Sequence, residues 1–162
     1  MLEVRRIAAD VLPASDLIAA MIEDLEPLYG RIDGDEAPSA TPAEMGPPGG
    51  AFLVLYEDGV PIAGGGIKPL GERLCEIKRM YVRPEARGRG VARRLLVALE
   101  DAARELGYAQ VRLDTGARQP HARALYESSG YAEIADYNGN PHASFWGEKN
   151  LVDSGQNCSG QG

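Results

Sequence analysis

The sequence predicts an α/β fold in which a mostly antiparallel sheet contains one central parallel strand pair and carries helices. Three strand-like segments joined by short turns lie between residues 51 and 82, a pattern typical of an antiparallel meander. A strand–helix–strand unit follows over residues 74–115, and such a crossover forces its two strands to run parallel. Amphipathic segments between the strands predict helices packed on the sheet.

The first predicted elements are a strand over residues 2–7 and a helix over residues 10–29. In the helix, apolar residues recur at spacings of one, three and four, which places them on one buried face. Pro13 suits a first helical turn, and Gly30 is a plausible stop. Residues 31–50 are rich in Gly and Pro and predict a long loop, either a binding loop or a disordered one.

The next predicted elements are strands over residues 51–56, 60–68 and 74–82. Asp58-Gly59 is a hairpin signal between the first two. The run Gly64-Gly65-Gly66 could be taken for a phosphate loop. However, no helix and no Gly-Lys-Ser/Thr follows it, so a bulge or close strand packing is the better interpretation.

The C-terminal half continues with a helix over 91–106, a strand over 111–115, a short helix from Pro120 to about Gly130, and closing strands over 131–136 and 144–151. Gly107 suits the end of the longer helix. Residues 1–152 are therefore expected to form a single domain. Residues 153–162 are polar and Gly-rich, and they predict a disordered tail.

Composition narrows the classes of function. The chain has 162 residues and a formal net charge of −7, which argues against general affinity for nucleic acid. It has no apolar stretch long enough to span a membrane, and its two cysteines make neither a disulfide framework nor a metal site. The default expectation is a cytoplasmic protein without a membrane partner.

Positive charge is nevertheless concentrated in one segment. Residues 78–94 contain seven of the chain's 17 Lys and Arg residues, against the single acid Glu85. This pattern indicates either a site for one polyanion of limited size or a solvated helix face with salt bridges.

Within that segment, residues 80–92 run from a strand through a Gly/Arg loop into a helix. Backbone N–H groups at a helix start lack intrahelical acceptors and carry the positive end of the helix dipole. Gly88 and Gly90 let the backbone approach a ligand closely, and Arg87 and Arg89 add charge. The spacing fits neither a Walker A loop nor a Rossmann fingerprint, but a pyrophosphate is still the expected ligand.

Two motifs carry a family resemblance. Arg87-x-x-Gly90-x-Ala92 resembles the Arg/Gln-x-x-Gly-x-Gly/Ala signature of the GNAT acetyltransferase superfamily. Residues 119–131 resemble the family's Asn-x-x-Ala-x-x-Leu-Tyr-x-x-x-Gly-Phe/Tyr segment, with Gln119 in place of Asn. The resemblance covers residues 2–151 and implies a GNAT-like twisted sheet, with helices on both faces and a splayed central parallel pair.

The resemblance also implies acetyl-CoA as co-substrate, with its pyrophosphate on the signature loop and its pantetheine arm along backbone groups of the preceding strand. The N–H of Val82 would polarise the thioester carbonyl. The expected cofactor-binding residues are Met80, Tyr81, Val82, Arg87, Gly88, Arg89, Gly90, Val91, Ala92 and Gln119.

Catalytic candidates follow from the same comparison. Tyr126 matches the family tyrosine proposed as general acid, although it could instead be an aromatic anchor. Glu76 could act as a base, directly or through water, or simply pair with Lys78. The expected substrate-binding residues are Tyr29, Asp114, Tyr137 and Asn138. No metal is implied, because the two histidines are isolated in the sequence.

A run of acids could attract a cationic amine, or be a solvated loop: Asp24, Glu26, Asp33, Asp35 and Glu36. The leading hypothesis is direct acetyl transfer to a primary amine of a small molecule. The alternatives are a protein N-terminal or lysine acetyltransferase, and an acyl-CoA-binding module without turnover. A homodimer is left open.

Overall fold

The computed structural model describes residues 1–29 and 40–152, without the side chain of Tyr29. Its elements are β1 (Leu2–Arg6), α1 (Ala14–Tyr29), β2 (Ala51–Glu57), β3 (Val60–Gly71), β4 (Leu74–Val82), the short 3₁₀ helix η1 (Pro84–Ala86), α2 (Val91–Glu105), β5 (Gln110–Gly116), α3 (Pro120–Ser128), β6 (Ala132–Glu133) and β7 (Ala143–Asn150). The expected tail, the first part of the 31–50 loop, and the acids Asp33, Asp35 and Glu36 lie outside the described residues.

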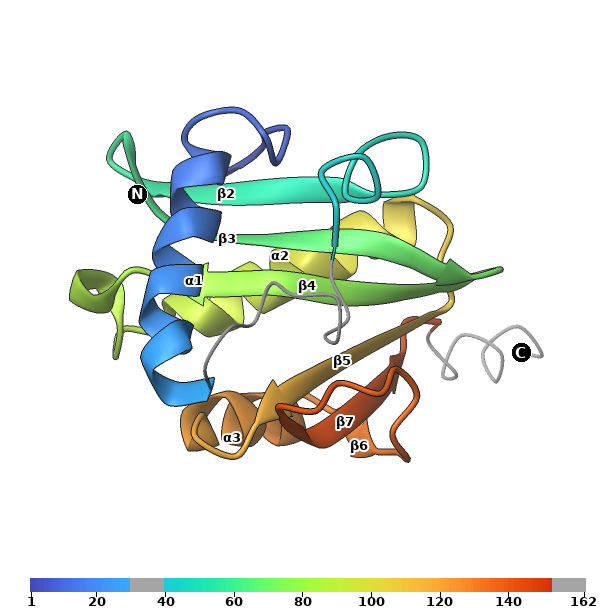
Figure 1. Ribbon diagram of the computed structural model, residues 1–162. Helices are drawn as coiled ribbons and strands as arrows, with labels where there is room; N and C mark the ends of the chain where they lie inside the picture. The colour runs from blue at the N-terminus through green and yellow to red at the C-terminus, as the bar shows by residue number, and fades with distance from the viewer. Residues whose placement is uncertain (30–39, 153–162) are drawn as a thin grey trace, which may run out of the picture.

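Within the described residues, the strands form one sheet in the order β1-β2-β3-β4-β5-β7-β6 (Figure 1). Neighbouring strands run antiparallel except for β4 and β5, which run parallel and are joined through α2. This arrangement confirms the predicted fold class.

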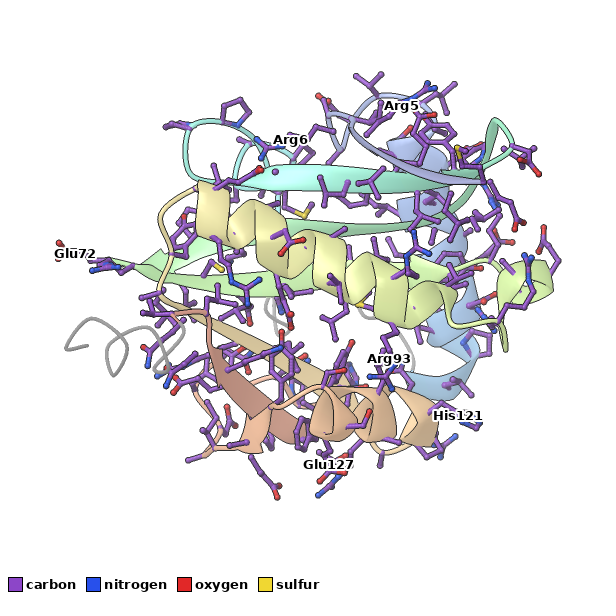
Figure 2. The ribbon with its side chains drawn as sticks, turned by 180° about the vertical axis from the view of Figure 1, so that it is seen from behind. Arg5, Arg6, Glu72, Arg93, His121 and Glu127 are labelled. Atoms are coloured by element: carbon purple, nitrogen blue, oxygen red, sulfur yellow. The ribbon has the colours of Figure 1, made fainter. Side chains whose placement is uncertain are left out.

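Helices cover both faces of the sheet: α1 crosses one face, and α2 and α3 lie on the other (Figures 1 and 2). Leu17 of α1 is buried in one apolar cluster together with Phe52, while Leu95 and Leu99 of α2 belong to a second cluster. Burying a side chain of this size stabilises the fold by about 1.5–3 kcal/mol. The two clusters hold the helices firmly against the sheet, which fixes the walls of the site described below.

The three glycines of β3 allow the helices to pack closely on the sheet. A Cβ at Gly64 would approach Leu17 and Phe52 to 3.0 Å, and one at Gly65 would approach Leu99 to 2.9 Å. A Cβ at Gly66 would collide with Met45. The predicted bulge is confirmed, because the β3–β4 register shifts between Gly64 and Gly66, and the close packing at these glycines is with side chains that cover the sheet.

That register shift is a β-bulge in β4. Gly64 pairs with Tyr81 and Gly66 with Lys78, so Gly65 stands opposite two residues. One of the two is Arg79, whose φ of 58° lies in the left-handed region that non-glycine residues rarely adopt. The parallel pairing of β4 with β5 ends at Glu76, three residues before Arg79. From there to their C-terminal ends the two strands separate, as Figure 1 shows.

Several predicted boundaries were wrong. The helix predicted from residue 10 begins at Ala14, and the strand predicted over 131–136 is only Ala132–Glu133. The chain leaves that strand because the carboxylate of Asp136 accepts hydrogen bonds from the backbone N–H groups of Asn138 and Gly139, which closes a turn.

The later part of the predicted 31–50 loop is packed rather than loose. Thr41 and Glu44 bond reciprocally: the Thr41 N–H donates to the Glu44 carboxylate at 3.0 Å, and the Glu44 N–H donates to Thr41 Oγ1 at 3.2 Å. Met45 is fully buried against the sheet. No periodic pattern in the sequence predicts this packing, which depends on the space above Gly66.

No helix in the described part of the chain is both long and apolar enough to cross a membrane.

Candidate active site

A cleft of about 770 Å³ opens where β4 and β5 separate. Its walls come from the end of β4, the loop before α2, and parts of α1 and α3. Nine of the ten residues expected to bind the cofactor line it: Met80, Tyr81, Val82, Arg87, Gly88, Gly90, Val91, Ala92 and Gln119.

One end of this cleft is the N-terminus of α2. Gly88 and Gly90 have φ values of 79° and 78°, which the sequence anticipates by placing glycine at both positions. Gly90 is the N-cap residue, so the N–H groups of Val91 and Ala92 stand in the first turn, where no intrahelical acceptor is available. This end of the cleft therefore suits a phosphate group.

The side of the cleft formed by β4 offers backbone groups. The Arg83 N–H donates to the Ile62 carbonyl at 2.8 Å, so Arg83 bonds toward β3. Backbone groups alternate between the two edges of a strand. Those of Val82 and Met80 therefore face the gap toward β5, where a ligand can pair with them as an added strand would.

The two arginines of the loop are placed differently. The Arg87 Nε donates to the Val82 carbonyl at 2.9 Å, and its guanidinium bonds the Asp24 carboxylate of α1 at 3.0 Å. Arg89 does not line the cleft and forms a two-point ion pair with Glu57, at 2.9 and 3.0 Å. Arg87 therefore belongs to the cleft wall, whereas the Arg89 side chain points elsewhere.

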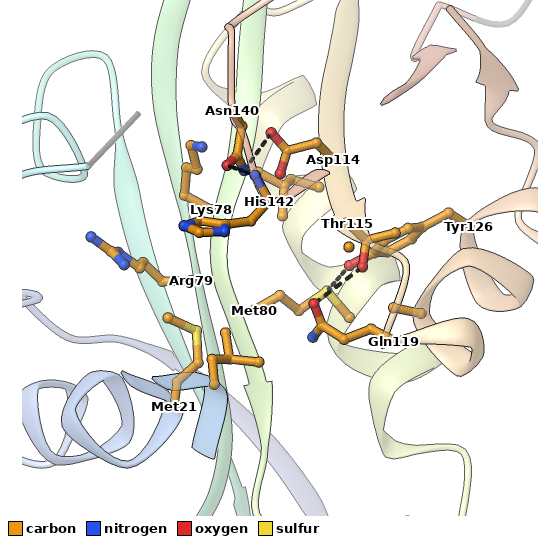
Figure 3. A pocket seen from close by; sticks show the side chains of 14 residues that line it. Met21, Lys78, Arg79, Met80, Asp114, Thr115, Gln119, Tyr126, Asn140 and His142 are labelled. Atoms are coloured by element: carbon orange, nitrogen blue, oxygen red, sulfur yellow. Dashed lines mark hydrogen bonds between the residues drawn. The ribbon is translucent and has the colours of Figure 1, made fainter. Parts of the chain in front are cut away.

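A second, smaller cleft of about 170 Å³ adjoins the first, because the two share lining residues; Figure 3 shows the smaller cleft. It is more polar than the first. Its polar lining consists of Lys78, Arg79, Asp114, Thr115, Gln119, Asn140 and His142. The residues that line both clefts mark the junction between them: Met21, Leu25, Met80, Gln119, Ala122 and Tyr126.

Tyr126 is therefore at the junction. Its side chain is 7% exposed, and its hydroxyl lies 3.8 Å from the Met80 sulfur. Burial raises the pKa of Tyr126 well above its usual value, and the nearby Asp114 carboxylate adds to the effect. The hydroxyl is thus protonated at neutral pH and can donate a proton or a hydrogen bond.

Glu76 is placed behind the small cleft rather than in its lining. It is 2% exposed, and its carboxylate accepts hydrogen bonds from the Tyr137 hydroxyl and from Asn138 Nδ2 at 3.1 Å. Lys78 Nζ lies 3.6 Å away. Burial and the Glu76 charge raise the pKa of Tyr137 strongly, so Tyr137 stays a donor. The pairing of Glu76 with Lys78, which the sequence offered as the alternative to a base role, is present.

Asn138 links two carboxylates. Its Nδ2 donates both to Glu76 and to Asp114, which lines the small cleft. Trp146 Nε1 donates to Asn138 Oδ1 at 3.0 Å, which fixes the side-chain amide so that its NH₂ faces the carboxylates. Of the four residues expected to bind substrate, Asp114 lines the small cleft. Tyr137 and Asn138 do not line it. They lie behind it, where Tyr137 bonds to Glu76 and Asn138 bonds to both carboxylates.

The fourth, Tyr29, ends α1, and its side chain lies outside the described residues. Over residues 1–29 and 40–152, no group of three His, Cys, Asp or Glu side chains is placed to hold a metal ion. Sequence reasoning missed Arg79 and Asn140 as lining residues of the small cleft. Arg79 enters it through a bulge, for which only the glycine run opposite gave a signal.

Comparison with known proteins gives a consistent result. Residues 18–131 match the family model described as the acetyltransferase (GNAT) family. The uncharacterized N-acetyltransferase YjgM of Escherichia coli is 40% identical over 93 residues, which cover 56% of this chain and 55% of YjgM. An IAA acetyltransferase of Azospirillum brasilense is 34% identical over 123 residues, covering 75% of this chain and 80% of that protein. This chain thus spans about half the length of the first relative.

Solved structures agree. A Klebsiella pneumoniae protein assigned as an acyl-CoA N-acyltransferase superposes with a TM-score of 0.75 at 31% identity, covering 94% of this chain and 99% of that one. The PaiA N-acetyltransferase of Thermoplasma acidophilum, solved in complex with coenzyme A, shares the fold with a TM-score of 0.69 at 18% identity, covering 93% and 99% of the two chains.

Proposed function

Because this chain belongs to the GNAT acetyltransferase family, we propose that it transfers an acetyl group from acetyl-CoA to the primary amine of a small molecule. The observation that carries the proposal is the meeting of two unlike clefts at Tyr126. The larger one ends on a helix N-terminus suited to phosphate, and the smaller one is polar and holds a carboxylate.

The residues fit acetyl-CoA along the larger cleft. The first turn of α2, with Gly88 and Gly90, would hold the pyrophosphate, and the backbone of Met80 and Val82 would hold the pantetheine arm. The Val82 N–H would then lie near the thioester carbonyl and stabilise the negative charge that develops there. The PaiA N-acetyltransferase, which shares this fold, was solved in complex with coenzyme A, and this supports a coenzyme A site in a chain of this fold.

Tyr126 would donate its proton to the departing thiolate, a role that typically accelerates a reaction by about 10²–10⁴-fold. Asp114 lines the acceptor cleft near Tyr126, so we assign it to hold the amine and receive its proton. Glu76, which the sequence predicts as a base acting directly or through water, is buried and bonded to Tyr137 and Asn138, so we assign it to position Asp114 through Asn138.

The size of the small cleft favours a small acceptor over a protein. A volume of about 170 Å³ lies below the range of about 300–1,000 Å³ that holds drug-sized ligands. A peptide acceptor and a non-catalytic acyl-CoA-binding role are the alternatives that an activity assay would expose. Dimerisation and a cytoplasmic location stay predictions from the sequence and its resemblance.

The test is a calorimetric titration with acetyl-CoA, with ATP as the competing polyanion. We expect salt-sensitive binding of acetyl-CoA and much weaker binding of ATP. Gly90→Ala should weaken acetyl-CoA binding by about tenfold, because a side chain disfavours the left-handed N-cap conformation.

Gly107→Ala is the matched control. Gly107 has a φ of 96° just beyond the opposite end of α2, and no atom lies within 4 Å of its Cβ position. That variant should lose similar stability but keep acetyl-CoA affinity. Equal binding of ATP, or equal effects of the two glycine variants on affinity, would remove the basis of the assignment.

A further inference from the structure

Charges of opposite sign line opposite sides of the small cleft. Lys78 and Arg79 come from β4, and Asp114 comes from β5 (Figure 3). Because β4 and β5 no longer pair at this level, the two sides stand apart with the cleft between them. Such a separation suits a ligand that itself carries both charges.

The position of Lys78 is unusual for a lysine. Its side chain is only 11% exposed, and burying an ammonium group is costly unless anions lie close by. Glu76 provides one such charge at 3.6 Å, but its carboxylate is shared with Tyr137 and Asn138. An ammonium group has three N–H donors, so Lys78 has the capacity to bind a second anion inside the cleft.

The opposite side is arranged for a cation. Asp114 Oδ2 is held by the side-chain amides of Asn138 and Asn140, the latter at 3.4 Å. These bonds fix the carboxylate beside Tyr126, whose raised pKa reflects the Asp114 charge in part. An amine that reaches the junction of the two clefts therefore meets a carboxylate that can hold it and take its proton.

Building on the proposed function, we propose that the acceptor is a zwitterion: a free amino acid or a close analogue, with its amine toward Asp114 and Tyr126 and its carboxylate toward Lys78. Arg79 lines the same cleft and adds to its positive side. The volume of about 170 Å³ suits a group of about the size of an amino acid.

With these groups, every bond and proton of the acetyl transfer can be accounted for. The acceptor enters as an ammonium and loses one proton to solvent to become the neutral amine. A bond forms between its nitrogen and the acetyl carbonyl carbon, and the carbon–sulfur bond breaks. The nitrogen loses a second proton to Asp114, and the thiolate takes the proton of Tyr126. Solvent exchange then restores Asp114 and Tyr126, and the products are an N-acetylamino acid and free coenzyme A.

The test compares three matched acceptors in a thiol-release assay: each standard amino acid, its carboxamide, and the amine that lacks the carboxyl group. For the best amino acid we expect kcat/KM to exceed that of its carboxamide by about 10–100-fold, because a site built for a polar group rejects the analogue without it. Lys78→Met should abolish this preference, and Lys78→Arg should restore much of it.

Lys68→Met is the matched control, since Lys68 pairs with Glu44 at 3.2 Å and does not line the cleft. It should keep the preference, and all three lysine variants should keep acetyl-CoA affinity. Equal kcat/KM for acid and carboxamide, faster turnover of the amine without a carboxyl group, or a Lys78→Met variant that keeps the preference would overturn the zwitterion proposal alone. A protein that does not bind acetyl-CoA, or that binds it and turns over no amine, would overturn the proposed function instead.

Discussion

At the scale of single residues, the hydroxyl of Tyr126 should carry the proton transfer. Tyr126→Phe is expected to lower kcat by about 10²–10⁴-fold and leave the acetyl-CoA affinity unchanged, because only the hydroxyl is lost. Since its pKa is raised, Tyr126 should cause no fall in kcat between pH 7 and 10. A pH–rate profile of both proteins measures this.

Tyr131→Phe is the control for that variant. The two rings lie 5.9 Å apart, but the Tyr131 hydroxyl donates to the buried carboxylate of Glu100 at 2.8 Å and lines neither cleft. Loss of the Tyr131 hydroxyl should lower the free energy of unfolding by about 1–3 kcal/mol, because Glu100 loses a buried partner, and should leave kcat unchanged. If Tyr126→Phe kept full turnover, Tyr126 would be an aromatic anchor only.

At the scale of elements, α1 and the loop before α2 are joined through one carboxylate. Asp24 of α1 accepts hydrogen bonds from Arg87 at 3.0 Å and from the Tyr81 hydroxyl at 3.1 Å. Asp24 also lines the large cleft, so its charge opposes that of a bound pyrophosphate. Asp24→Asn should therefore tighten acetyl-CoA binding by about 3–10-fold at low salt and less at high salt.

Glu26→Gln removes the same charge from the same helix but does not touch the cleft, so it should have little effect on affinity. Calorimetry at two salt concentrations compares the variants. Weaker binding of acetyl-CoA by Asp24→Asn would mean that the Asp24 carboxylate orients Arg87 toward the ligand, and that this effect outweighs the repulsion between Asp24 and the pyrophosphate.

Much of the arrangement of elements could be predicted from the sequence, but the contacts between distant elements could not. Local sequence patterns predict the order of strands and helices, the hairpin at Asp58-Gly59, and the glycine turn at Gly88 and Gly90 that precedes α2. The structure has all three. The contact from Asp24 to Arg87 spans 63 residues, and no local pattern encodes it. The sequence predicted Glu76 as a base and Asp114 as a substrate-binding residue, but only the structure shows that Asp114 lines the small cleft and that Glu76 lies behind it.

At the scale of the whole molecule, three tyrosines with strongly raised pKa values tie stability to alkaline pH: Tyr126 and Tyr131 are buried, and Tyr137 is half-buried. Burial raises the pKa of Tyr126, Tyr131 and Tyr137 far above the usual value of about 10. Above that pH the unfolded chain loses these protons and the folded chain keeps them. The free energy of unfolding should therefore fall as pH rises past 10, by about 1.4 kcal/mol per pH unit for each tyrosine.

Urea denaturation between pH 8 and 11 measures this slope. Above pH 10 the slope in Tyr126→Phe should be smaller by about 1.4 kcal/mol per pH unit, while the stability at pH 8 changes little because the hydrogen bond that is lost has a sulfur as its acceptor. An unchanged slope in that variant would show that Tyr126 titrates alike in the folded and unfolded chains.

The bulge at Arg79 also has an evolutionary consequence. Beyond it, β4 offers the backbone N–H and C=O groups of Met80 and Val82 to the proposed donor, and every residue except proline supplies both groups. Mutation can therefore replace side chains around the small cleft while the edge that receives the donor persists. A gene duplicate could exchange one acceptor for another through a few substitutions and inherit its acetyl source unaltered.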